Sequence, residues 1–268
     1  FSAMRNGMMS LALAVVVAAA IPSSSIAQRG QRGAGTANVA TPAPPHDPRD
    51  LSGVWTRTSR VLTMSAETPP MTAWGKEKFH ATRPVYGPRA VPGGNDPMSN
   101  CDPLGIPRNL FLEVSIYPME ILQTPKRTLQ FFEWAHVWRE IWTDGRKLPQ
   151  NPDPRWMGYS TGRWEGDTFI VDTIGMDEPT WLDHFGNPVS DDMRLEERYR
   201  RVDRDTLELT MTINAPKAYT KPWVSEKKIM KLAPQGQEIQ ELFCVPSEEQ
   251  AFNRLVRDPA AGTSKPPQ

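Results

Sequence analysis

The chain has 268 residues, and its 31 basic and 31 acidic side chains give a formal net charge of zero at pH 7. This balance gives no electrostatic basis for binding nucleic acid or an anionic membrane surface, so neither partner is predicted. Nine Trp and 27 Pro are high numbers for this length. Many prolines indicate many irregular connections, which favours an all-β protein with long loops over a helical one.

The first 27 residues read as a cleavable secretory signal peptide. Met4 is taken as the start, Arg5 supplies the positive region, and residues 10–21 form an apolar run without charge. This run is too short for a bilayer span, which needs roughly 20 apolar residues, and small residues precede a cut after Ala27. A retained anchor helix is the alternative. No second apolar run of spanning length follows, so we predict a secreted or periplasmic protein with no membrane span in the mature chain.

Removal of the signal leaves about 240 residues, enough for one substantial domain. Residues 28–50 carry almost no large apolar side chain and are predicted to be a flexible leader. Residues 51–258 are predicted to form the domain, and residues 259–268 a C-terminal tail. Two cysteines in an oxidising compartment predict one disulfide, Cys101–Cys244, and two buried free thiols are the alternative.

Strand signals dominate the domain and follow one another in hairpin order. A first strand is predicted over residues 51–63, a short helix over 72–82 with Thr72 as N-cap, and an irregular stretch over 83–110. Further strands are predicted over residues 119–124, 127–134, 136–143, 158–164, 168–174, 193–202, 206–213, 223–232 and 238–245.

Period-two alternation shows how these strands pack. Leu207, Leu209, Met211 and Ile213 fall on one face, which is typical of a sheet that is wet on one side. The charge run over residues 194–205 is interpreted as a solvated outer face with cross-strand ion pairs. Closure removes exposed edges, so we predict an all-β, antiparallel up-and-down barrel of about eight to ten strands with one or two short helices.

The stretch from Phe131 to Trp142 suggests a binding site. If the stretch is extended, one face carries Phe132, Trp134, His136, Trp138, Glu140 and Trp142. Aromatic rings supply rigid contact area for a planar or apolar molecule, and a few polar groups orient it. The predicted ligand-binding residues are Trp134, Trp138, Trp142, Trp156, Tyr159 and Trp181. Alternatively these rings fill the barrel core, or a turn near Ala135 divides them between two faces.

The chain has four histidines, and two of them are candidates for acid–base chemistry. His136 and His184 are predicted to meet Glu133 or Asp183 at a cleft mouth, with Arg139 in support. A structural role for each His is the alternative. No His spacing typical of a metal site is present, so no metal is predicted.

Gly53-Val54-Trp55 resembles the Gly-x-Trp signature of lipocalins and the wider calycin barrels, in which the Trp plugs the closed end. The Arg that lipocalins pack across this Trp has no unique counterpart in the sequence. The segments LSGVW (51–55), CDPLGIPR (101–108), WMGYSTGRWEGDTFIVDT (156–173), the WLDHFG segment and YTKPW (219–223) resemble a large, uncharacterised family of secreted proteins of Gram-negative bacteria. This resemblance implies a calycin-like barrel and transfers no catalytic residue.

The function predicted from the sequence is binding of a small apolar or aromatic molecule inside an aromatic-lined barrel. A cofactor-independent hydrolase, lyase or isomerase that uses a His–carboxylate pair at the barrel mouth is the alternative. A third possibility is a structural protein whose barrel is filled by its own side chains. No cofactor is predicted, because a protein outside the cytoplasm has little access to NAD or ATP.

Overall fold

The computed structural model describes residues 45–58, 62–84, 87–111, 117–260 and 262. The predicted signal peptide, residues 28–44 of the predicted leader and most of the predicted tail lie outside these residues. Within the described leader, Arg49 Nε donates to the carbonyl oxygen of Gly166 at 3.0 Å. No helix in the described ranges is long and apolar enough to cross a bilayer.

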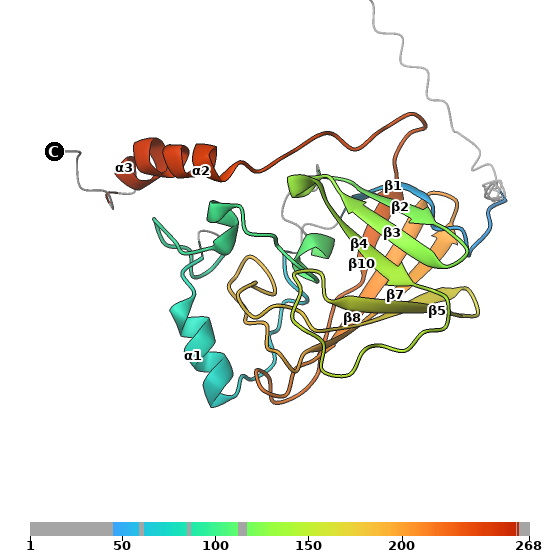
Figure 1. Cartoon of the computed structure of the whole chain (residues 1–268), viewed down its shortest axis with the longest axis horizontal. Helices are drawn as coiled ribbons and strands as arrows, with labels where there is room; N and C mark the ends of the chain where they lie inside the picture. Colours follow the sequence, from blue (N-terminus) through green and yellow to red (C-terminus); the bar gives the residue numbers. More distant parts are fainter. Residues whose placement is uncertain (1–44, 59–61, 85–86, 112–116, 261, 263–268) are drawn as a thin grey trace, which may run out of the picture. The chain divides into compact units, whose positions relative to one another are not determined.

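Strands are the main regular elements of the described domain (Figure 1). They are β1 (Gly53–Arg57), β2 (Met119–Gln123), β3 (Arg127–Phe132), β4 (Val137–Trp142), β5 (Tyr159–Glu165), β6 (Thr168–Ile174), β7 (Arg194–Asp203), β8 (Thr206–Asn214), β9 (Trp223–Val224) and β10 (Lys228–Leu232). The helices are α1 (Ala73–Ala81), α2 (Pro246–Phe252) and α3 (Asp258–Ala260), with 3-10 turns η1 (Pro97–Asn100), η2 (Arg108–Phe111) and η3 (Trp134–His136) and a π-helix, η4 (Asn253–Arg257).

Nine of these strands close a barrel, which confirms the predicted closed β architecture. Strands β1 to β8 are paired in chain order, and β10 joins β8 to β1. The two-residue β9 is an additional strand on β8. The prediction of a wholly antiparallel barrel is wrong at one pair, because β4 and β5 are parallel.

The parallel pair follows from the length of its connection. Parallel strands need a crossover of a dozen or more residues, whereas a hairpin needs about two. Residues 143–158, which we call the crossover segment, return the chain to the end at which β4 began. The β4–β5 register contains only Ile141↔Ser160 and Trp142↔Thr161. The β4–β5 pairing, which we call the seam, is therefore short compared with the other strand pairings of the barrel wall.

Alternation in β8 is confirmed: Leu207, Leu209, Met211 and Ile213 are all fully buried. The interpretation of residues 194–205 as a solvated face is wrong for two of its charges. Glu197 is 0 % exposed and Arg201 is 8 % exposed. Both fall in phase with the buried Leu195, so the strand period turns them inward together with the apolar residues.

The predicted extended stretch from Phe131 to Trp142 is interrupted by η3. Ala135 and His136 have φ of 56° and 51°, in the left-handed region, so β3 and β4 do not form one continuous strand. In β4, Arg139 and Ile141 are buried and point inward. Phe132 therefore does not share a face with Trp138 and Trp142, and the alternative, a turn near Ala135 that divides these residues between two faces, is confirmed.

The predicted strand over residues 238–245 is also absent, since this segment is irregular and mostly exposed. The Gln240 amide donates to Glu133 Oε2 at 2.8 Å, and this bond holds the segment to the barrel end. The predicted strand over 223–232 divides into β9 and β10.

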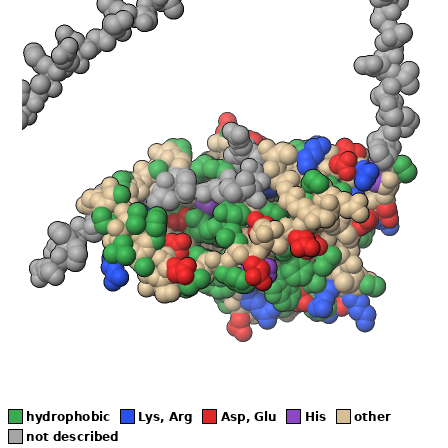
Figure 2. Space-filling view, turned by 90° about the horizontal axis from the view of Figure 1, so that it is seen from above, with side chains coloured by type: hydrophobic (Ala, Val, Ile, Leu, Met, Phe, Trp, Pro, Cys, Tyr) green, Lys and Arg blue, Asp and Glu red, His purple; other side chains and the backbone are tan. Residues whose placement is uncertain are grey.

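The predicted disulfide is confirmed, since Cys101 and Cys244 are joined across a sequence separation of 143. The bond fixes the C-terminal segment to the end of η1, and Asn253 Nδ2 donates to the Ser99 carbonyl at 2.9 Å. Figure 2 shows the molecule from above the view of Figure 1, and hydrophobic side chains gather across the middle of the face that it presents.

The first helix matches its sequence signal, whereas β1 (Gly53–Arg57) is shorter than the strand predicted over residues 51–63. Thr72 caps α1 by accepting from Gly75 N at 3.0 Å, as predicted. Trp55 is buried and donates from Nε1 to the Leu51 carbonyl at 2.9 Å. The Arg201 guanidinium lies 5.4 Å from the Trp55 ring centre.

Candidate functional site

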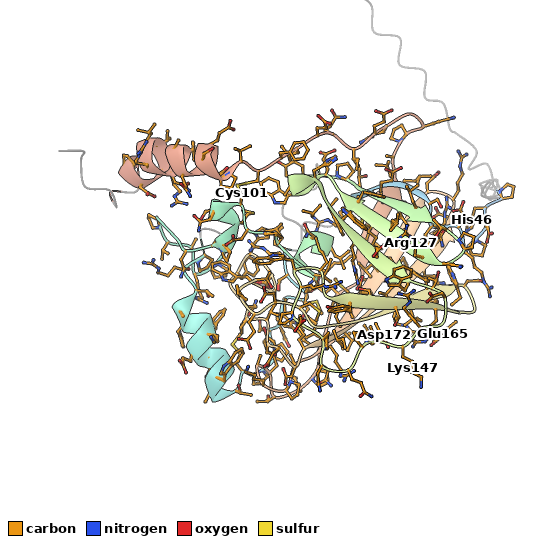
Figure 3. The ribbon with its side chains drawn as sticks, viewed as in Figure 1. His46, Cys101, Arg127, Lys147, Glu165 and Asp172 are labelled. Carbon is orange, nitrogen blue, oxygen red and sulfur yellow. A yellow bond between two sulfur atoms is a disulfide. The ribbon has the colours of Figure 1, made fainter. Side chains whose placement is uncertain are left out.

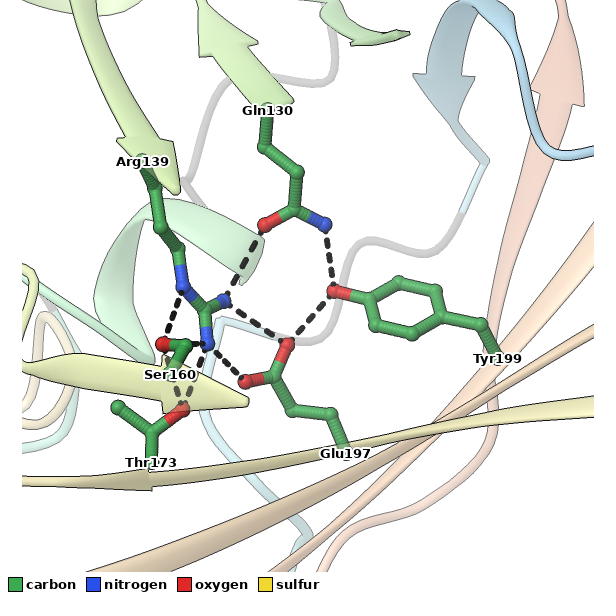
Figure 4. Close-up of polar contacts among 6 residues, drawn as sticks. All are labelled: Gln130, Arg139, Ser160, Thr173, Glu197 and Tyr199. Atoms are coloured by element: carbon green, nitrogen blue, oxygen red, sulfur yellow. Dashed lines mark hydrogen bonds and ion pairs between the residues drawn. The ribbon is translucent and has the colours of Figure 1, made fainter. Parts of the chain in front are cut away.

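The barrel interior contains a polar network centred on Arg139 (Figure 4). Its six members are Gln130 from β3, Arg139 from β4, Ser160 from β5, Thr173 from β6, and Glu197 and Tyr199 from β7. The network therefore spans five neighbouring strands, including both sides of the β4–β5 seam.

The Arg139–Glu197 pair is bidentate, with Nη2 2.6 Å from Oε1 and Nη1 3.1 Å from Oε2. The remaining Arg139 donors reach Ser160 and Thr173 hydroxyls and the Gln130 carbonyl oxygen at 2.7–3.2 Å. Burial alone would lower the pKa of Arg139, but the Glu197 carboxylate raises that pKa above its usual value. Each guanidinium nitrogen thus has a partner, which offsets the desolvation of a buried cation.

Tyr199 completes the network. Its hydroxyl donates to Glu197 Oε2 at 2.7 Å and accepts from Gln130 Nε2 at 3.0 Å. Burial, followed by the charge of Glu197, raises the Tyr199 pKa well above its usual value. The phenol is therefore neutral at ordinary pH, and its hydroxyl serves as both donor and acceptor within the network.

Apolar side chains fill the barrel around this network. They include Trp55, Phe132, Ile141, Phe169, Val171, Leu207 and Leu209. A cavity of about 20 Å³ lies between Trp55, Arg57, Met119, Phe132 and Met230. It offers room for about one water molecule. This cavity is far smaller than the ligand chamber predicted from the sequence.

Two of the predicted catalytic residues lie near η3. His136 is exposed, and its ring centre is 5.0 Å from that of Phe243. The buried Glu133 carboxylate accepts from the Gln240 amide. Both residues thus contact the C-terminal segment.

The other predicted pair, Asp183 and His184, is buried in the loop between β6 and β7. Asp183 accepts hydrogen bonds from the Thr63 hydroxyl and from Asn187 Nδ2 (2.6 Å). Burial raises the Asp183 pKa, and these hydrogen bonds oppose the rise. The Asp183 carboxylate thus joins Thr63 and Asn187 and stabilises the loop between β6 and β7.

His184 lies against a buried ion pair. Arg108 Nη2 is 2.7 Å from His184 Nδ1 and 2.6 Å from Asp96 Oδ2. Because Arg108 can only donate, Nδ1 accepts and the imidazole proton is on Nε2. Burial, followed by the charges of Arg108 and Arg57, lowers the His184 pKa far below its usual value. His136 and His184 thus have different partners in the structure, and their catalytic role stays a prediction.

The six predicted ligand-binding rings are placed in several environments. Trp181 is buried, and Arg108 lies 5.6 Å from its ring centre. Trp134 borders an apolar hollow of about 790 Å³ beside Phe252 and Val256. Trp156 is half-buried in the crossover segment. The structure brings together the remaining three, Trp138, Trp142 and Tyr159.

These three rings line a pocket of about 420 Å³ on the outer side of the β4–β5 seam. We call it the crossover pocket. Its walls are Trp138, Glu140 and Trp142 from β4; Gly158, Tyr159 and Thr161 at and before β5; and Arg146, Lys147, Leu148, Pro149, Arg155 and Met157 from the crossover segment, with Arg139 and Ser160 at the seam. The strands supply one wall, and the connection that makes them parallel supplies the other.

Cations surround the rings of the crossover pocket. The Arg146 guanidinium is 3.5 Å from the Trp142 ring centre, and that of Arg155 is 4.1 Å from the Tyr159 ring centre. Trp138 is 53 % exposed. Figure 3 shows Lys147 on the crossover segment, outside the barrel. The pocket combines open aromatic surface with positive charge.

Sequence reasoning missed the whole polar network except Arg139, and it missed the pocket cations. The period of β7 signals that Glu197 and Tyr199 point inward with Leu195. Arg146, Lys147 and Arg155 lie in a long connection between two strands, and nothing else in the sequence indicates that they line a pocket.

Groups of three or more His, Cys, Asp or Glu that could hold a metal ion are absent from the described part of the chain. Comparison of the chain with models of known protein families gives no match. Comparisons with curated proteins and with solved structures also give no match. The function must therefore be inferred from the geometry.

Proposed function

We propose that the protein binds a small planar molecule in the crossover pocket. One observation carries the proposal: three of the rings selected from the sequence, Trp138, Trp142 and Tyr159, line a single pocket of about 420 Å³. This volume lies in the range of small-molecule sites, roughly 300–1,000 Å³. The proposed ligand lies on the outer wall of the barrel, because the interior is occupied by the protein's own side chains.

The exposure of Trp138 supports this assignment. Half of a large apolar ring is left in contact with water, beside Trp142 and close to the apolar Leu148 and Pro149. Burying such a ring against a planar ligand gains hydrophobic and stacking free energy. The catalytic alternative has less support, since Asp183 and His184 are buried among loop partners.

Two further proposals accompany the binding function. We propose an extracytoplasmic location, which the disulfide supports because such bonds persist in oxidising compartments. We also propose a calycin-like barrel, which the packing of Arg201 across Trp55 supports.

A neutral fluorescent probe, N-phenyl-1-naphthylamine, tests the binding function. We expect saturable binding to the wild type with one site per chain, and at least a tenfold weaker affinity for Trp138→Ser, because exposed aromatic anchors dominate such sites. Phe252→Ser is the matched control, since Phe252 is also 53 % exposed but borders the other hollow. Equal affinity of all three proteins, or no binding to the wild type, would overturn the proposal.

A further inference from the structure

We infer that the ligand of the crossover pocket is an aromatic anion, a planar ring system that carries a carboxylate or a similar acidic group. This inference rests on the proposed function and adds the chemical class of the ligand. It comes from the pairing of charges around the pocket.

Two charges of the pocket wall are already neutralised within the protein. Arg146 forms a bidentate pair with Asp144, with Nη2 2.7 Å from Oδ2 and Nε 2.9 Å from Oδ1. Glu140 forms an ion pair with Arg127 of β3. Neither Arg146 nor Glu140 therefore leaves a charge for a ligand.

The third charge of the seam, Arg139, is also neutralised, since its guanidinium is saturated by Glu197 and the surrounding hydroxyls. Two cations remain, Lys147 and Arg155. Among the described residues, neither has a carboxylate within 4.0 Å. The pocket wall thus has an excess of two positive charges after all internal pairs are counted.

The positions of these two cations fit an anionic substituent on a ring. Arg155 lies over Tyr159, on β5, and Lys147 is next to Arg146, which lies over Trp142 on β4. The cations thus come from both ends of the crossover segment, beside rings on both strands. A ring that stacks against the strand wall would direct its acidic group toward the crossover segment. There the guanidinium of Arg155 offers a planar pair of donors that matches a carboxylate.

The test compares 2-naphthoate with its neutral counterpart, 2-naphthamide, by isothermal titration calorimetry. We expect the wild type to bind the carboxylate about tenfold more tightly than the amide, the size expected for two exposed ion pairs. The preference should fall as NaCl is raised, because salt screens exposed charges.

The variant Lys147→Gln/Arg155→Gln should lose this preference, so that its affinities for the carboxylate and for the amide become equal. Lys221→Gln, at an exposed lysine outside the pocket, is the charge control and should keep the wild-type preference. Equal wild-type affinities for both ligands, or a preference that survives the double variant, would overturn the inference while leaving the binding function intact. Failure of the wild type to bind either ligand would overturn both.

Discussion

The inner and outer sides of the β4–β5 wall are built by alternate residues of the same strands, and they differ in how completely their polar groups are paired. On the inner side, Arg139 and Ser160 belong to a network in which each guanidinium nitrogen has a partner. On the outer side, Trp138 is half exposed and Lys147 and Arg155 face solvent. The barrel interior is thus filled and paired, whereas the outer wall is open, as the proposed binding function requires.

The inner network also supports the outer pocket. Only two register pairs join β4 to β5 through the backbone, so the seam depends on side chains. Arg139 on β4 bonds to Ser160 on β5, behind the pocket. We expect these bonds to keep Trp138 and Tyr159 at a fixed separation, which would lower the ordering cost of the proposed ligand binding.

The largest expected effect comes from breaking the inner ion pair. Arg139→Met should reduce the free energy of unfolding by about 3–5 kcal/mol, because Glu197 is left buried without its counter-ion. Urea denaturation measures the loss. Glu140→Gln, at the adjacent and outward-facing residue of the same strand, should cost less than about 1 kcal/mol, since its pair with Arg127 is partly exposed to solvent.

The double variant Arg139→Met/Glu197→Leu completes this experiment. It should recover part of the loss, because no buried charge remains. Similar losses for Arg139→Met and Glu140→Gln would contradict the distinction between the two sides of the wall.

A pH series extends the comparison to the buried groups at the barrel end. The His184 pKa is far below 6.5 in the folded protein, so only the unfolded state takes up this proton as the pH falls below 6.5. Acidification therefore removes stability, at about 1.4 kcal/mol per pH unit.

Between pH 7 and pH 5 the wild type should lose about 2 kcal/mol more than His184→Asn, whose amide oxygen can still accept from Arg108. Denaturation midpoints at the two pH values check the difference. Parallel losses in both proteins would show that His184 does not set this slope.

The smallest expected effect concerns packing. A Cβ on Gly162 would lie 2.5 Å from the Phe169 ring and 2.9 Å from Ile141 Cγ2. Gly162→Ala should therefore cost at least about 1 kcal/mol, as overpacked cores do, despite the lower chain entropy of Ala. Thr161→Ala, on the outer face, should cost less than about 0.5 kcal/mol. Thermal denaturation compares the two, and a stabilised Gly162→Ala would show that the interior has free space.

Much of the barrel was predictable because its signals are local. Alternation identified the buried face of β8, and the two cysteines identified the disulfide. The turn at Ala135 could be named from the sequence only as an alternative, because Ala135 lacks the usual Gly signal for a positive φ. The extended run was the simpler prediction, and it placed Trp134 and Trp138 on one face.

The network and the pocket were harder to predict, because each depends on which strands are neighbours. The inward position of Glu197 follows from its phase with Leu195, but its partner is 58 residues away. The crossover pocket exists because β5 pairs with β4 in parallel, and that pairing is not encoded in any short segment.

The Cys101–Cys244 bond has a consequence for proteolysis. Strands β2 to β10 all lie between the two cysteines, so the bond closes them into one covalent ring. The crossover segment, with Arg146 and Lys147 exposed, offers trypsin a cut inside this ring. A molecule nicked there would keep its full mass on a non-reducing gel and separate into two fragments only after the disulfide is reduced.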